Sequence, residues 1–414
     1  MNRYSFFFEQ ITKIKEHEVF ELKKTLNEKI DNKKIREQYI KQHEAATNMA
    51  ADYVQILLEN KQFKSFEFYS ANVSKLMPSS DENEYFKWWF ELFKWKYSEQ
   101  LQLRNPFMLE NLRVFSKENP GVNPNRSAIY TTFHYGSSQS IIGYLISNNV
   151  NLVLLVDQKA FNSKSIFEQY IEKTKQILRI NIEYDILNVE DHKTILKLIS
   201  YIKKGYSVFA YPDGNNGIGG VYNKHKQLLR IKFFSDEILV RKGIAHIAFA
   251  TKTPIVPIIC SYKNNLLPNI FIYDAISPES KNNRDEYALL TIKELWNILE
   301  KHINNYPAQW NGWEYVHKYF DFENIKMDVD SINKKKNLKV NRKIKLNSKN
   351  FRVFKIDEQS YLFNRILYKT YEIDRELFDV LLTGKGYTKE QILKKGIKIQ
   401  LLNELVKNGV FNFI

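Results

Sequence analysis

The chain has 414 residues, of which 43% are hydrophobic, enough for two or three domains with cores of their own. Its 62 basic and 47 acidic residues give a formal charge of +15, which favours an anionic partner: phospholipid head groups, an acidic carrier protein, a phosphorylated cofactor or nucleic acid. The single cysteine, Cys260, excludes an intrachain disulfide and a zinc site built on several thiolates.

The N-terminal residues predict helices and no targeting segment. Phe6–Phe8 are followed at once by Glu9, so no signal peptide is expected. No apolar run reaches the roughly 18 residues that a spanning helix needs. Apolar residues recur at helical spacing over residues 8–70. We therefore expect a helical region over residues 1–80 and a cytoplasmic protein whose membrane contact, at the inner face, is peripheral.

A break at Pro78–Asp81 precedes a stretch that is unusually rich in aromatic residues, from Tyr85 to Tyr97. Two interpretations remain open for this predicted helix. It packs on the core of the next domain, or it inserts its rings at a lipid surface or along an acyl-chain groove.

Short apolar strands alternate with helices over the next 130 residues, and this alternation indicates an α/β domain with a mostly parallel sheet. The domain is expected to span residues 81–323. Strands are predicted at 128–132, 151–156, 180–186, 206–211 and 254–261, and helices at 140–146, 166–178, 193–203 and 245–251.

The sharpest local feature is Thr132-Phe133-His134-Tyr135-Gly136-Ser137-Ser138-Gln139, where a strand runs into a turn and then a helix. His134 is thereby placed at the carboxyl edge of the sheet, where open α/β folds carry reactive groups. A neutral imidazole there can take a proton from a hydroxyl or amine. Gln139 falls on the first helical turn and can fold back to hold the ring. From these residues alone, a structural histidine remains an alternative.

A second feature is the loop Pro212-Asp213-Gly214-Asn215-Asn216-Gly217, which directly follows a predicted strand. Its glycines expose many backbone amides, which suit phosphate or a developing oxyanion. The loop is neither a phosphate-binding loop of the Gly-Lys-Ser/Thr type nor a dinucleotide fingerprint. A plain surface loop is the alternative.

Five segments in order resemble the lysophospholipid and glycerophosphate acyltransferase superfamily, most closely the late acyltransferases of lipid A biosynthesis. His134 to Gln139 resembles the His-x4-acid motif, and Pro212-Asp213-Gly214 its Pro-Glu-Gly segment. The resemblance covers about residues 85–320. The other three segments are Phe233-Phe234-Ser235 with Arg241 to Ala245, then Thr253 to Pro257, and Pro307-Ala308-Gln309-Trp310 through His317.

The resemblance implies acyl transfer from an acyl carrier protein or acyl-CoA, used as co-substrate with no bound cofactor or metal, with His134 as general base. One departure matters: Gln139 replaces the family's acid, so it can accept the Nδ1 proton but brings no charge. The enzyme is then slower, or it uses another acid such as Asp213, or the chain is a non-catalytic relative. Candidates for binding substrate are Gly214, Asn215, Arg230, Lys232, Arg241 and Lys242; for the basic four, a solvated charged face is the alternative.

The C-terminal part predicts a basic linker at 324–350 and a small winged-helix-like domain at 351–414. The linker is solvated or tethers the chain to an anionic surface. Tyr361-Leu362-Phe363-Asn364 and Glu376 to Leu381 resemble the small chaperone-like module of pyrroloquinoline quinone biosynthesis, which implies binding of a precursor peptide as an added strand. A DNA-binding or purely structural winged helix is the alternative.

Together the two resemblances suggest acylation of a ribosomally made peptide; the conventional acceptor is a glycolipid or lysophospholipid. Two other classes remain open. One is a non-enzymatic lipid- or peptide-binding protein, which Gln139 permits. The other is nucleic-acid binding through residues 331–350 and the C-terminal module, for which basic charge alone supplies affinity without specificity.

Overall fold

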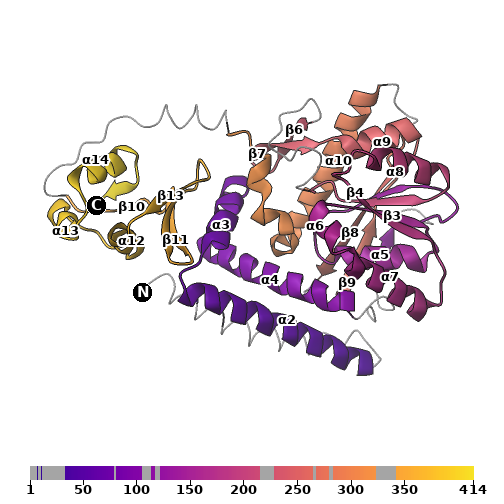
Figure 1. Cartoon of the computed structure of the whole chain (residues 1–414), viewed down its shortest axis with the longest axis horizontal. Coiled ribbons are helices and arrows are strands. Elements are labelled where there is room, and N and C mark those ends of the chain that lie inside the picture. The colour runs from indigo at the N-terminus through magenta and orange to yellow at the C-terminus, as the bar shows by residue number, and fades with distance from the viewer. Residues whose placement is uncertain are drawn as a thin grey trace. The chain divides into compact units, whose positions relative to one another are not determined.

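The computed structural model describes residues 7, 11, 33–78, 81–104, 113–116, 122–214, 228–263, 267–278, 283–322 and 342–414 (Figure 1). Their contacts divide the chain into two compact units. The sheet unit takes in residues 14–50 and 87–319, and the C-terminal unit takes in 1–13, 51–86 and 320–414. The C-terminal unit therefore includes residues from the region that the sequence assigned to a separate helical segment. The predicted domain boundaries themselves remain predictions.

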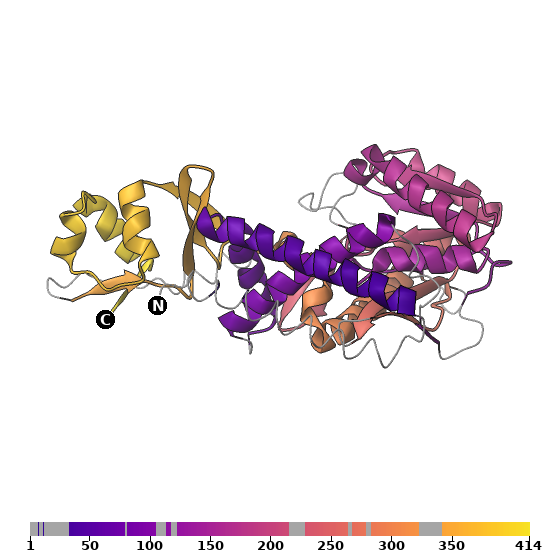
Figure 2. The same ribbon diagram turned by 90° about the horizontal axis from the view of Figure 1, so that it is seen from below.

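The described N-terminal residues are helical, as the apolar spacing indicates. Helix α2 spans Lys33–Glu59 and is drawn as one uninterrupted helix in Figure 2. Helix α3 spans Lys64–Leu76, and α4 spans Glu82–Arg104. The predicted helical residues 8–10 and 12–32 and the basic residues 331–341 lie outside the described part of the chain.

The aromatic stretch on α4 is buried in protein. Trp89 and Phe90 have no exposed surface and Trp95 keeps 3%. The Trp95 ring stacks on Tyr262 with centroids 4.3 Å apart. Of the two interpretations of this helix, packing on a protein core is the one that the structure favours, because buried rings have no surface to offer to lipid.

Seven described strands form the central sheet in the order β1-β9-β8-β2-β5-β3-β4. Five neighbouring strands, β8-β2-β5-β3-β4, run parallel to one another, and β9 pairs with β8 antiparallel. The sheet is therefore mostly parallel, as predicted. The bounds are β1 Arg113–Ser116, β2 Ile129–Thr131, β3 Leu152–Val156, β4 Tyr184–Asn188, β5 Ser207–Ala210, β8 Ile255–Lys263 and β9 Leu267–Ile272.

Helices cover both faces of this sheet because each crossover between parallel strands returns across a face. Figure 1 shows α8 and α9 above β3 and β4, and α5 and α7 below them. An antiparallel hairpin, β6–β7, precedes α9. The bounds are α5 Ser138–Ser147, α6 Gln158–Asn162, α7 Lys164–Leu178, α8 Thr194–Lys203, β6 Leu228–Phe233, β7 Asp236–Arg241, α9 Gly243–Thr251 and α10 Arg284–Asn305.

Three short 3-10 helices follow α10: η3 Pro307–Gln309, η4 Asn311–Glu314 and η5 Val316–Tyr319. This segment returns to the start of α5, because the amide of Gly136 donates to the carbonyl of Gln309 at 2.9 Å and that of Asn311 to the carbonyl of His134 at 2.8 Å. Trp310 and Trp313 are fully buried. The segment that resembles the closing motif of the family is thus packed against the His134 turn.

The C-terminal unit contains a three-stranded antiparallel sheet in the order β11-β12-β13. Buried Arg352 on β11 lies between Glu67 of α3, at 3.5 Å, and Glu82, at 3.0 Å. These ion pairs attach the strand to helices from the N-terminal part of the chain. The bounds are β10 Ile344–Leu346, β11 Phe351–Ile356, β12 Gln359–Asn364, β13 Lys369–Ile373, α12 Arg375–Leu382, α13 Lys389–Leu393, α14 Ile399–Lys407 and β14 Phe411–Phe413. The predicted winged helix remains a prediction.

Candidate active site

His134 and Asp213 are brought together because they follow neighbouring parallel strands. Strands β2 and β5 pair from Ile129 with Val208 to Thr131 with Ala210, so both leave the sheet at the same edge. The chain then continues into the His134 turn on one side and into Asp213 on the other. Carboxyl ends of adjacent parallel strands are where open α/β sheets carry their sites, and the predicted position of His134 agrees with this rule.

The side chains of the two residues form a direct pair. Nδ1 of His134 lies 3.0 Å from Oδ1 of Asp213, and the backbone amide of His134 donates to Oδ2 at 3.1 Å. Asp213 is fully buried, whereas 39% of the His134 side chain is exposed. A carboxylate at Nδ1 holds the proton on that nitrogen, so Nε2 is left as the basic atom.

Asp213 is held by three further groups. Nε1 of buried Trp310 donates to Oδ2 at 2.9 Å, and the hydroxyl of Tyr319 donates to the Asp213 carbonyl at 2.8 Å. The Tyr315 hydroxyl lies 3.5 Å from Oδ2 and 3.4 Å from Nδ1 of His134. A carboxylate satisfied in this way is fixed in one orientation, and it fixes the ring that it contacts.

The pKa of His134 follows from this environment. Burial lowers it, but the charge of Asp213 and the hydrogen bond to Asp213 outweigh burial, so the pKa is raised above that of a free imidazole. The ring is also covered by Tyr211, which stacks on it with centroids 4.2 Å apart and an angle of 19° between the planes. The arrangement favours a histidine that accepts a proton and is stabilised once charged.

Gln139, which was expected to hold the ring, is placed differently. Its Oε1 is buried and has no hydrogen-bond partner among the described residues. Nδ1 of His134 is occupied by Asp213 instead. The sequence suggested Gln139 and Asp213 as polar partners of His134, and the structure pairs the ring with the carboxylate of Asp213.

A cavity of about 490 Å³ adjoins this pair, within the range of ordinary ligand pockets. His134, Tyr211 and Tyr315 are among the polar residues that line it. Its walls are apolar and come from β3, β5, α8 and α9, among them Leu154, Leu198, Phe209, Ile244 and Ile247. A mostly apolar cavity with a histidine in its wall has the lining to hold a hydrocarbon chain with its reactive end at the imidazole.

The predicted substrate-binding residues divide into groups. Gly214 and Arg241 line the cavity. Arg230 is paired with Glu237 at 3.3 Å on the β6–β7 hairpin, and Lys242 with Asp285 at 2.9 Å. Lys232 is exposed on β6, and Asn215 lies outside the described residues. Only Gly214 and Arg241 are therefore brought to the His134 site among those that the structure describes.

The sequence did not single out Tyr211, Tyr315 or Tyr319 as partners of the pair. Tyr211 directly precedes the Pro-Asp-Gly segment, so its position beside a candidate acid was a usable signal. Burial raises the pKa of the Tyr315 and Tyr319 hydroxyls well above the ordinary tyrosine value. Both hydroxyls therefore stay protonated and act as hydrogen-bond donors at neutral pH.

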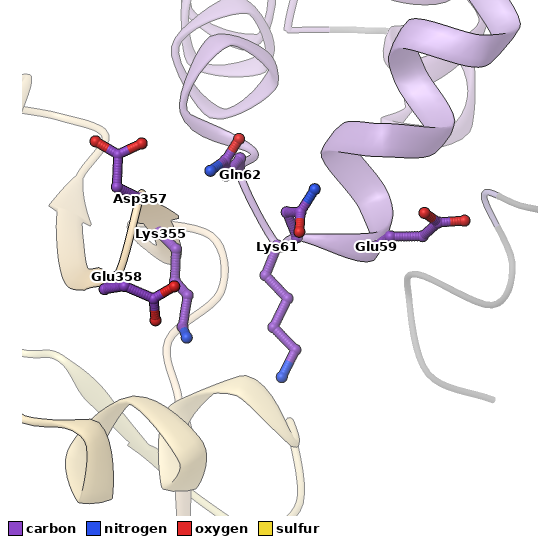
Figure 3. A pocket seen from close by; sticks show the side chains of 7 residues that line it. Glu59, Lys61, Gln62, Lys355, Asp357 and Glu358 are labelled. Atoms are coloured by element: carbon purple, nitrogen blue, oxygen red, sulfur yellow. The ribbon is translucent and has the colours of Figure 1, made fainter.

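A second cavity, of about 380 Å³, lies within the C-terminal unit (Figure 3). Its side chains are charged or amides, and Figure 3 shows Lys61 and Lys355 projecting in the same direction. Such a lining does not suit a hydrocarbon chain. The apolar cavity beside His134 is therefore the candidate for the reaction.

Comparison with known proteins supports an acyltransferase. Residues 148–320 match the family model of bacterial lipid A biosynthesis acyltransferases. The match ends where the sequence resemblance was predicted to end, and it begins after the His134 turn. No curated protein sequence matches the chain.

Among solved structures, the chain is similar to the 1-acyl-sn-glycerophosphate acyltransferase PlsC of Thermotoga maritima, with 12% identity over 60% of this chain and 96% of the other. The TM-score is 0.30, and at this value the likeness carries no argument about the fold. The relation to acyltransferases therefore rests on the match to the family model. This match covers β3 to η5, including Asp213 and Trp310. Through residues 148–320 this chain is similar to the bacterial lipid A biosynthesis acyltransferases.

Proposed function

We propose that the protein moves a fatty acyl group from the thioester of an acyl carrier protein or acyl-CoA to a hydroxyl or amine, with His134 as general base. The observation that carries the proposal is the His134–Asp213 pair, at 3.0 Å, with His134 in the wall of a mostly apolar cavity. The pair supplies the base, and the cavity supplies a place for the acyl chain.

The reaction runs in one direct transfer. Nε2 of His134 takes the proton of the acceptor hydroxyl or amine as its oxygen or nitrogen attacks the thioester carbonyl carbon. The new bond forms, the carbon–sulfur bond breaks, and the sulfur leaves as a thiol after taking the proton from the imidazolium. Asp213 stabilises the imidazolium between these steps. Gly214 and Arg241 both line the cavity. The Gly214 amide already donates to the Tyr211 carbonyl at 3.1 Å, so the Arg241 guanidinium is the group proposed to stabilise negative charge on the carbonyl oxygen or on the donor.

A peptide acceptor is supported by one feature of the C-terminal unit. Strand β13 is exposed along Lys369 to Glu372 and pairs, among the described strands, with β12 alone. An exposed strand edge can add an extended peptide as a further strand. The acceptor that we propose first is therefore a ribosomally made peptide bound at β13, with a glycolipid or lysophospholipid as the second candidate.

Membrane contact is proposed as peripheral and at the cytoplasmic face. The described helices include none with the length and apolar character needed to cross a bilayer. The charge of +15 supports attraction to anionic lipid or to an acidic carrier. Nucleic acid is not proposed as a partner, because basic charge is the one feature that favours it and such charge supplies affinity without specificity.

The experiment is a transfer assay with labelled acyl-CoA and acyl carrier protein as donors and a panel of lysolipids, a glycolipid and candidate precursor peptides as acceptors. Mass spectrometry of the products identifies the acceptor. We expect transfer to at least one acceptor class. A folded protein that transfers from neither donor to any acceptor would instead be a non-catalytic lipid- or peptide-binding relative, and the proposal would be wrong.

Acyl-chain preference gives a second expected result. Leu198 on α8 lines the cavity and is 1% exposed, whereas Leu196 on the same helix is 72% exposed. Leu198→Phe adds bulk to a packed wall, which should lower kcat/KM for a long donor by about tenfold relative to a short one. Leu196→Phe is the matched control and should leave the ratio unchanged. Equal effects of the two variants would show that this cavity does not hold the acyl chain.

A further inference from the structure

Glu99 near the end of α4 is linked to the His134 site through two hydroxyl groups. The Ser138 hydroxyl donates to Oε1 of Glu99 at 3.0 Å, and the Tyr211 hydroxyl donates to Oγ of Ser138 at 3.3 Å. The Tyr211 ring is the one that stacks on the His134 imidazole. A side chain far from the motif in sequence thus helps to determine where that ring lies.

Glu99 also meets the N-terminal end of α5, a helix of ten residues whose own cap is incomplete. Ser137 at the N-cap makes no side-chain hydrogen bond to the helix amides, since its Oγ is bonded to Oγ of Ser140 at 2.6 Å. The backbone amides of Ser138 and Gln139 favour the ionised form of Glu99. Negative charge at this end of a helix is stabilising because the free amides carry partial positive charge.

The first turn of α5 has no acidic residue of its own. Gln139 occupies the place where the resemblance expects an acid, and its buried Oε1 is unpartnered among the described residues. The carboxyl group that the motif lacks at this position is supplied nearby by Glu99, which comes from a different helix. The carboxyl group of Glu99 can take the place of the missing acid only when α4 packs against α5 in the folded protein.

The charges of the two residues influence one another. After Asp213, Glu99 and Asp157 are the carboxylates that raise the pKa of His134. Burial raises the pKa of Glu99 to about 7, against the opposing effects of Ser138, His134 and the α5 amides, although the residue keeps some solvent exposure. Among the described residues, the other titratable groups that interact with Glu99 include Tyr170 of α7, Tyr211 after β5 and Cys260 of β8.

We propose that Glu99 is a positioning residue for His134, a second carboxylate that holds Tyr211 and the α5 turn in place and whose charge favours the imidazolium formed during transfer. Glu99 thereby takes over the role of the acidic residue that the resemblance expects at the position of Gln139. The proposal rests on the function proposed above, since it assigns Glu99 to the same site. Glu99 is not a catalytic residue, because it acts through Ser138 and Tyr211.

The decisive test follows the protonation of His134 directly, by NMR titration of the full chain labelled at histidine. His134→Gln assigns the resonance. Glu99→Gln keeps a hydrogen-bond acceptor but removes the charge, so the His134 titration should move to lower pH. Glu91→Gln, which removes a carboxylate from α4 two turns earlier, is the matched control and should leave the titration in place. An unchanged His134 titration in folded Glu99→Gln would overturn the proposal.

Kinetics supply the second readout. In Glu99→Gln we expect kcat to fall roughly tenfold and the acid limb of kcat/KM to move to lower pH, whereas a purely structural role would lower activity at every pH alike. If Glu99→Gln does not fold, Ser138→Ala, which cuts the link to Tyr211, should give a similar drop in kcat, and unchanged kcat would overturn the proposal. A wild-type protein without transfer activity defeats the proposed function alone, because the NMR titration still decides the role of Glu99.

Discussion

Replacing His134 with Ala is expected to lower kcat for acyl transfer by about 10²- to 10⁴-fold, the range that a positioned general base contributes. The fold should survive, because the backbone amide of residue 134 keeps its hydrogen bond to Asp213 at 3.1 Å and the side chain is 39% exposed. His192→Ala, at an exposed histidine that does not line the cavity, is the matched control. Transfer at the wild-type rate by His134→Ala would remove the base from the mechanism.

The second variant, Asp213→Asn, removes the negative charge of the carboxylate and keeps nearly the same side-chain shape. The amide of Asn can donate to Nδ1, which favours the tautomer with its proton on Nε2, so the basic atom is lost and kcat should fall by up to about 10⁴-fold. The pH dependence has a definite sign. Asp213 raises the pKa of His134 against the effect of burial, so without the carboxylate this pKa falls. Neutral His134 then persists to lower pH, and the acid limb of the residual activity should move down.

These two variants are measured together, as kcat and kcat/KM across pH, with circular dichroism to establish folding. A residual rate in Asp213→Asn whose acid limb stays at the wild-type position would show that Asp213 does not set the His134 protonation. Equal loss in both variants would be consistent with one base acting as a unit with its carboxylate, since such effects are not additive.

Gly136→Ala is expected to destabilise the sheet unit by about 3 kcal/mol or more, from strain at positive φ together with overpacking. Gly136 has φ +58°, and a Cβ there would lie 2.0 Å from the carbonyl oxygen of Cys260 and 3.2 Å from Oε1 of Gln309. The Cys260 oxygen is backbone of β8 and cannot rotate away. The turn that presents His134 must therefore shift or the strand must move.

Gly205→Ala is the control for this effect within the same unit. Gly205 has φ +93°, yet a Cβ there meets nothing within 4 Å. The difference between the two variants in thermal unfolding isolates the clash from backbone strain. We expect the midpoint of thermal unfolding to fall by several degrees more in Gly136→Ala than in Gly205→Ala. Equal shifts would mean that the close approach to β8 is absent in solution.

Much of the sheet unit could be predicted from local pattern. The apolar strands at β3 and β5 and the helices α5, α7 and α8 were placed within a few residues, because buried parallel strands are continuous apolar runs and their helices show a clear period. The position of His134 followed from the same pattern. The choice of Asp213 as its partner was available as an alternative, since both residues follow predicted strands.

The rest depends on tertiary structure. The long helix α10 was not predicted, and neither were the β6–β7 hairpin and the antiparallel strand β9. Gln139 was assigned to the ring by its spacing alone, whereas the geometry gives Nδ1 to Asp213. Glu99 carries no local signal, because its contact with Ser138 joins residues 39 positions apart. Only the packing of α4 against the sheet brings that carboxylate to α5.

The separations within the site have a consequence for biosynthesis. His134 and Asp213 are 79 residues apart, Asp213 and Trp310 are 97 apart, and Asp213 and Tyr319 are 106 apart. Contacts of such long range form late, because loop closure must precede them. A nascent chain released only up to α10 would have its sheet strands and its histidine but neither the indole nor the phenol that fixes the carboxylate. Any activity that depends on the fixed carboxylate is therefore expected only after synthesis has passed η5.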